Sequence, residues 1–125
     1  MSRSEVPKAP PETRAPGRAL WASITTDYEL EQHELALLIE AVRTVDALDL
    51  LDAAVRSEGA IVAGPQGIRA HPALVEARAQ RVVLARLLAA LRLPSGEAGD
   101  EKVSARPQRR SGARGVYGIR GSVVS

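Results

Sequence analysis

The fold of this chain is constrained most by two long segments whose apolar side chains are regularly spaced. The first runs from Glu31 to Ser57 and the second from Pro72 to Leu93. Within each segment apolar residues recur at steps of three and four, which is the spacing of one face of an α-helix. The connection between them is short. The two helices are therefore predicted to form an antiparallel hairpin, which makes an arm and not a pocket.

Residues that start and stop helices stand at the ends of both segments. Glu34 takes the third helical position, where a carboxylate can accept a backbone N–H at the helix start. Gly59 suits the left-handed conformation that ends many helices. Pro72 opens the second helix, because an N–H is not needed in the first turn, and Pro94 ends it.

Two shorter elements complete the predicted structure. Residues 60–63 and 68–70 flank a Gly-Pro-Gln-Gly turn at 64–67, which predicts a two-stranded flap between the long helices. Residues 18–27 carry apolar side chains at helical spacing, among them Trp21, and are predicted to form a short helix that covers the helix pair.

The predicted fold class is all-α: a short N-terminal helix plus a long antiparallel helical hairpin, with a small β-flap between the long helices and disordered termini. Residues 1–17 are interpreted as a disordered basic, proline-rich arm, because closely spaced prolines prevent a continuous helix. Residues 18–94 are the predicted helical oligomerisation domain. Residues 95–125 are interpreted as a disordered basic tail of Arg, Gly and Ser, with too few large apolar side chains to offset the entropy of ordering.

A folded part this small is marginally stable alone, and its apolar stripes are wider than one helix pair needs. We therefore expect a closed homo-oligomer, a ring, held together through the long helices. The predicted interface consists of leucines on both helices: Leu38, Leu48, Leu51, Leu84, Leu88 and Leu91.

The composition argues against several functional classes. The chain has no cysteine, which excludes disulfides and thiolate metal sites. Its only histidines, His33 and His71, belong to no zinc-binding motif, so no metal site is predicted. No nucleophile–base pair or phosphate-binding loop stands out, and we expect no catalytic residue, no cofactor and no enzymatic activity. Without a signal-peptide core or an apolar stretch long enough for a membrane span, the expected location is cytoplasmic, with no membrane partner.

Basic side chains concentrate at the two ends of the chain, around an acidic middle. Residues 1–18 have four basic side chains against two acidic ones, residues 19–93 have seven against ten, and residues 94–125 have six against three. Flexible basic groups contact phosphates and release counterions, which favours double-stranded DNA as a partner. Protein docking and a merely solubilising tail are the alternatives. The candidate DNA-binding residues are Arg3, Lys8, Arg14, Arg18, Lys102, Arg106, Arg109, Arg110, Arg114 and Arg120.

The order of elements resembles the small-subunit family of the phage terminase, the DNA-packaging enzyme. In that family a Trp-containing first helix, a long second helix and a flap precede an Asn-Pro that opens a third helix, which ends near Leu-Gly-Leu-x-Pro. Here the matching residues are His-Pro at 71–72 and Leu-Arg-Leu-Pro at 91–94, and the resemblance spans roughly residues 18–95. His71 stands where the family has Asn, and Arg92 where it has Gly.

The resemblance implies the non-catalytic small subunit of a DNA-packaging terminase, located in the host-cell cytoplasm if the chain is phage-encoded. Such a subunit forms a ring-like homo-oligomer, binds viral DNA and delivers it to the large ATPase/nuclease subunit. The alternative is a helical protein–protein interaction or adaptor protein with no DNA role. Salt-dependent DNA binding would distinguish the two hypotheses.

Overall fold

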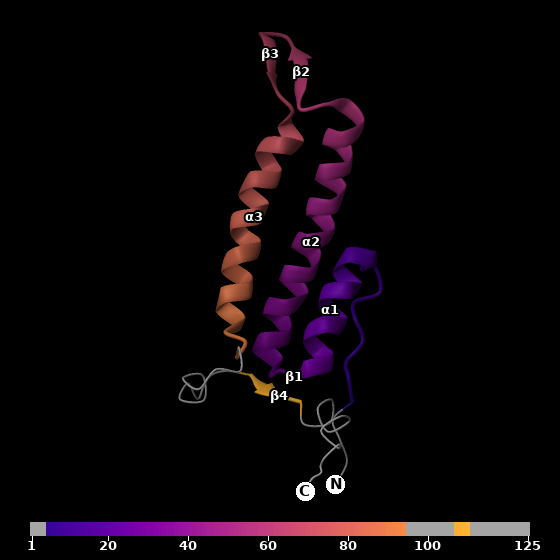
Figure 1. Ribbon diagram of the computed structural model, residues 1–125, viewed down its shortest axis with the longest axis vertical. Helices are drawn as coiled ribbons and strands as arrows, with labels where there is room; N and C mark the ends of the chain where they lie inside the picture. Colours follow the sequence, from indigo (N-terminus) through magenta and orange to yellow (C-terminus); the bar gives the residue numbers. More distant parts are fainter. Residues whose placement is uncertain (1–4, 95–106, 111–125) are drawn as a thin grey trace, which may run out of the picture.

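The computed structural model describes residues 5–94 and 107–110 (Figure 1). Its main elements are three helices: α1 (Ala15–Asp27), α2 (Gln32–Glu58) and α3 (Pro72–Leu91). Helices α2 and α3 form a long antiparallel hairpin, and α1 and α3 flank α2 on opposite sides. The predictions of a mostly helical chain and of a small flap between the long helices are confirmed.

The flap stands at the tip of the hairpin and consists of β2 (Ile61–Gly64) and β3 (Gly67–Ala70) (Figure 1). The strands are antiparallel, with Ile61 opposite Ala70 and Gly64 opposite Gly67. Gly67 has a φ of +108°, a conformation that side-chain-bearing residues rarely adopt. This glycine is therefore required by the turn that joins the two strands.

His71 lies at the base of the flap and caps the start of α3. Its Nδ1 accepts a hydrogen bond from the backbone N–H of Ala73 at 2.9 Å, and its Nε2 lies 2.6 Å from the Glu58 Oε1 at the end of α2. Since Nδ1 acts as acceptor, Nε2 carries the proton and donates to the carboxylate. One side chain thus supplies the cap of α3 and links it to α2.

The core lies where α1 covers the half of the hairpin that is distant from the flap. Its buried members come from all three helices and from β1 (Tyr28–Glu29). They are Trp21, Ile24, Tyr28, Leu38, Val42 and Leu91. Helix α1 does not extend to the flap (Figure 1), so the flap half of the hairpin has no third helix against it.

The start of α1 is capped by a side chain from α2. The Asp46 carboxylate accepts the backbone N–H of Arg14 at 2.8 Å through Oδ2 and the backbone N–H of Gly17 at 2.8 Å through Oδ1. Arg14 is the N-cap residue, and its own side chain makes no cap hydrogen bond. A carboxylate at this position also opposes the positive end of the helix dipole. Asp46 therefore fixes where α1 begins and how it approaches α2.

Helix α1 begins three residues earlier than predicted, because Pro16 fits the first turn of a helix instead of interrupting it. The preceding residues, which were predicted to belong to a disordered arm, lie along the helices. The Trp21 indole Nε1–H donates to the Pro7 carbonyl at 2.8 Å, and Thr13 is buried. The segment 5–14 is thus part of the packed structure.

A short C-terminal segment returns to the end of α1. Strand β4 (Gln108–Arg109) pairs antiparallel with β1, with Tyr28 opposite Arg109. The guanidinium of Arg109 lies 5.2 Å from the centre of the Tyr28 ring. Residues 107–110 were predicted to belong to a disordered tail and instead dock on the body. In the parts of the chain that the structure describes, no helix has both the length and the apolar character needed to cross a bilayer.

Candidate assembly and nucleic-acid surfaces

The leucines predicted to form an oligomer interface are used inside the hairpin. Leu38 is 0% exposed, Leu91 is 1% exposed and Leu48 is also buried, which leaves these side chains no surface for a second copy. Leu51, Leu84 and Leu88 are half-buried. The assignment of Leu38, Leu48 and Leu91 is therefore corrected: they belong to the core of a single chain. The sequence pattern identified apolar positions, but not which of them face the chain's own helices.

The outward face of α3 carries a different apolar set, here called the α3 stripe: Val75, Ala79, Val82 and Val83. All four are exposed, with Val75 at 54% and Val82 at 50%. Val75, Ala79 and Val82 follow one another at steps of four and three, the spacing of a seam against another helix. The buried residues Ala73 and Ala77 lie on the opposite face. Nothing in the described chain covers the stripe.

One face of the flap is also entirely apolar. Residues opposite each other in an antiparallel pair share a face, so the pairs Ile61–Ala70 and Ala63–Ile68 lie on the same side of the ribbon. All four are exposed, and Ile68 is 79% exposed. A two-stranded ribbon with one bare apolar side is only marginally stable by itself, which is typical of an element that packs on a partner.

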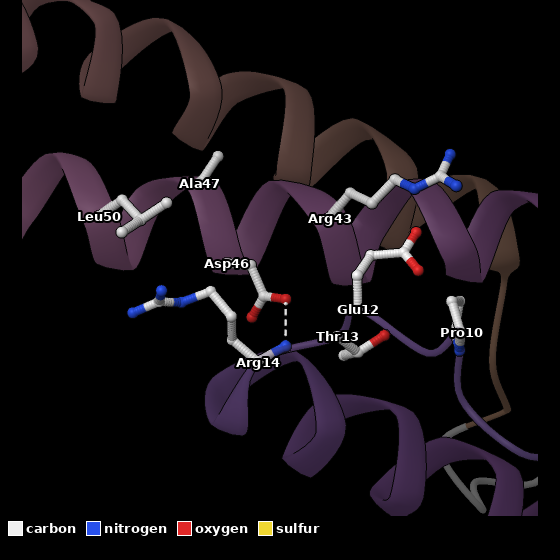
Figure 2. A pocket seen from close by; sticks show the side chains of 8 residues that line it. All are labelled: Pro10, Glu12, Thr13, Arg14, Arg43, Asp46, Ala47 and Leu50. Carbon is white, nitrogen blue, oxygen red and sulfur yellow. Dashed lines mark hydrogen bonds between the residues drawn. The ribbon is translucent and has the colours of Figure 1, made fainter.

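A groove is present on α2 beside the start of α1 (Figure 2). It has a volume of about 240 Å³ and lies near the Asp46 cap, with the exposed side chain of Leu50 at one end. This is room for one or two aliphatic side chains. The residues that line this α2 groove are Pro10, Glu12, Thr13, Arg14, Arg43, Asp46, Ala47 and Leu50.

The two long helices carry opposite net charges. Helix α2 has six acidic side chains against two arginines, whereas α3 has three arginines against Glu76. One ion pair joins the two helices, in which the Arg81 guanidinium of α3 donates to the Asp52 Oδ1 of α2 at 3.0 Å. Arg78 and Arg86 are exposed and make no hydrogen bond or ion pair with any other described residue. Helix α3 as a whole is therefore net basic, with Arg78 and Arg86 exposed, and α2 as a whole is net acidic.

The predicted DNA-binding residues are only partly described by the structure. Arg3, Lys102, Arg106, Arg114 and Arg120 lie outside the described residues. Of the others, Lys8, Arg14, Arg18 and Arg109 are exposed, although Arg14 pairs with Asp49 at 3.4 Å. Arg14 and Arg109 lie at opposite ends of α1, roughly 20 Å apart for a helix of this length. The described basic residues therefore form no single patch.

Arg110 is buried in contacts with the end of α1, which the sequence did not predict. Its side chain is 6% exposed. Its Nε donates to the Thr25 carbonyl at 2.6 Å, its NH1 lies 3.9 Å from the Glu29 Oε2, and its backbone N–H donates to the Asp27 carbonyl. Arg110 therefore holds residues 107–110 on the end of α1, and its guanidinium would have to leave these contacts to reach a phosphate.

Comparison with known proteins adds no relative. No protein-family model matches the chain, and neither a curated protein nor a solved structure matches it. The described residues contain no group of three His, Cys, Asp or Glu side chains that could hold a metal ion. The arguments about function therefore rest on the surfaces described above.

Proposed function

We propose that this chain is the non-catalytic small subunit of a phage DNA-packaging terminase. In this proposal it forms a ring-like homo-oligomer, binds viral double-stranded DNA and delivers it to the large ATPase/nuclease subunit. The observation that carries the proposal is a helical hairpin whose flap half has no third helix against it and which exposes apolar side chains on α3 and on one face of the flap. Such a surface favours assembly with other copies.

The order of elements also supports the proposal. A Trp-containing helix, a long helix, a flap and a third helix opened by His71-Pro72 follow one another as they do in the family that the sequence resembles. His71 stands where that family has Asn and performs the capping that Asn would perform, because its Nδ1 accepts the Ala73 N–H. The substitution therefore preserves the helix start.

DNA affinity is assigned to the basic ends of the chain. The hairpin itself is net acidic, because α2 has a larger excess of charge than α3, and it repels phosphates overall. In a ring each subunit adds its own basic ends, so weak contacts combine into one multivalent contact. The proposal therefore predicts DNA binding that is strong at low salt and falls steeply as salt increases.

The test compares two full-length variants that lose the same number of charges. One replaces four tail residues by Gln, and the other replaces four exposed arginines of the folded body. DNA binding of each is measured by mobility shift across a salt series. The tail set is Lys102, Arg106, Arg114 and Arg120, and the control set is Arg56, Arg69, Arg81 and Arg92.

The tail variant should bind DNA at least about tenfold more weakly than the control, with a smaller salt slope. If the control variant loses more affinity, the folded body and not the tail is the DNA-binding element. If the unmodified chain shows no salt-dependent DNA binding at all, the terminase proposal fails and the adaptor hypothesis takes its place.

A further inference from the structure

We infer that neighbouring copies associate head-to-tail, with the α3 stripe of one copy packed on the α2 groove of the next. This inference rests on the proposed ring and names the two surfaces that form it. The stripe supplies Val82 and Val83 as projecting apolar side chains, and the groove receives them beside Leu50. The two surfaces belong to different helices, so the contact is heterologous, which is the kind that generates rings.

Size and chemistry fit between the two surfaces. The stripe is a narrow row of valines and alanine on a helix, and the groove is about 240 Å³ with Pro10, Ala47 and Leu50 in its lining. Burial of an exposed valine in such a site stabilises the contact, because its apolar surface is removed from water. The exposed apolar surfaces of both helices would be covered by one repeated contact.

Charge decides between this contact and a symmetric one. Packing α3 against α3 of a second copy would bring two net-basic faces together, with Arg86 at the next position of the seam after Val82. Packing α3 against the groove instead brings the α3 arginines toward Glu12, while the groove arginines Arg14 and Arg43 are already paired with Asp49 and Glu40. Arg78 and Arg86 on α3 and Glu12 at the groove have no ion-pair partner among the described residues, so they are available to form one across the interface. Opposite charges favour the head-to-tail pairing, and like charges disfavour the symmetric one.

The two surfaces meet at one level along the hairpin. The Arg81–Asp52 ion pair at 3.0 Å sets Val82 and Leu50 at about the same level along the hairpin. Helix α3 and helix α1, beside which the groove lies, are on opposite sides of α2 (Figure 1). A contact between Val82 and Leu50 at one level adds little translation along the hairpin from copy to copy. A rotation between neighbouring copies then closes a ring, whereas a contact without rotation gives an open row.

Two full-length single variants test the inference, each with one of the two surfaces disabled. Leu50→Asp places a charge in the groove, and Val82→Asp places one on the stripe. Both positions are exposed in the single chain, so each variant should keep the helical content of the parent. Ala36→Asp is the matched control, because it adds the same charge at an exposed position of α2 roughly 21 Å from Leu50. Mass is measured by light scattering after size exclusion, and helical content by circular dichroism.

Each single variant should be monomeric, with self-association at least about 100-fold weaker than in the parent, whereas Ala36→Asp should assemble like the parent. An equimolar mixture of the two variants should form a dimer and nothing larger. This is because the intact stripe of Leu50→Asp can still bind the intact groove of Val82→Asp, and the other two surfaces are disabled. A symmetric interface cannot produce this result.

The outcomes separate the interface from the function. If Leu50→Asp assembles like the parent, or if the mixture stays monomeric, the head-to-tail contact is overturned while the proposed ring stands. If the parent chain itself is monomeric at every concentration, the proposed ring fails as well.

Discussion

The Asp46 cap yields a prediction whose magnitude can be worked out from the structure. Asp46→Ala removes both acceptors at the start of α1, leaving the N–H groups of Arg14 and Gly17 without their partners. Loss of an N-cap costs roughly 0.5–2 kcal/mol, and a hydrogen bond to a charged group contributes roughly 1.5–3 kcal/mol. Because the Arg14 N–H is exposed, water can replace one of the two bonds. The net loss in free energy of unfolding should be about 2 kcal/mol.

Trp21 makes the effect observable at α1 itself. It is the only tryptophan of the chain and lies buried against α2, so its fluorescence reports whether α1 is docked. Urea unfolding at fixed protein concentration should show a lower midpoint for Asp46→Ala by fluorescence and by circular dichroism. The matched control is Asp49→Ala, which loses only the half-exposed ion pair with Arg14 and should cost less than about 1 kcal/mol.

A variant on α1, Gly17→Ala, tests the close contact between the start of this helix and Asp46. A Cβ built on Gly17 would lie 2.7 Å from the Asp46 Oδ1, which is closer than such atoms approach each other. Gly17→Ala should therefore destabilise the parent, although alanine is the better helix former. In the Asp46→Ala background the cost should shrink without vanishing, since that contact is gone and the contact with the Thr13 Cγ2 at 2.8 Å remains. Additive effects of the two substitutions, or an Asp46→Ala protein as stable as Asp49→Ala, would refute the cap.

Three further predictions follow from single residues. Arg92 ends α3 with a φ of +53°, which costs a side-chain-bearing residue roughly 1–2 kcal/mol. Arg92→Gly should remove this cost but add the larger chain entropy of glycine, so the free energy of unfolding in urea titrations should rise by about 0.5–1 kcal/mol. His71→Ala should cost about 1 kcal/mol in the same assay through loss of the α3 cap, whereas His71→Asn should recover most of it. Arg110→Met should release residues 107–110, seen as faster hydrogen exchange at the amide of residue 110, which donates to Asp27; unchanged protection would contradict the structural role of Arg110.

The helices and the flap could be predicted from the sequence because their signals are local. The apolar periodicity placed α2 and α3 within two residues of their observed ends, and Gly67 and Pro72 marked the turn and the helix start. Periodicity does not say which apolar face turns inward when a helix has two. Helix α3 has leucines, Ala73 and Ala77 toward α2 and valines toward solvent. Three of the six leucines predicted to form the interface are buried inside the single chain.

The contacts made between distant residues had no local signal. Nothing in the sequence around Asp46 marks it as a helix cap. It becomes one only because α1 packs beside it. Arg110 is 85 residues from the carbonyl that it binds. The sequence around it is rich in Arg, Gly and Ser, a composition that is typical of unfolded chain. Pro16 was interpreted as a helix breaker, although the first turn of a helix accepts it. Tertiary geometry decided the cases of Asp46 and Arg110, whereas the signal of Pro16 was local and was misinterpreted.

Figure 1 shows that β4 and the segment before α1 lead to the end of the hairpin opposite the flap. Rotational symmetry keeps equivalent points of all copies at one height and one radius. An assembly of such hairpins would therefore have two different rims. Every flap would lie in one, and the points where the basic ends leave the folded body would lie in the other. DNA would meet one rim, and an apolar partner would meet the other. The two rims could then be occupied at once without competition, and the direction of the assembly on DNA would be set by the hairpin itself.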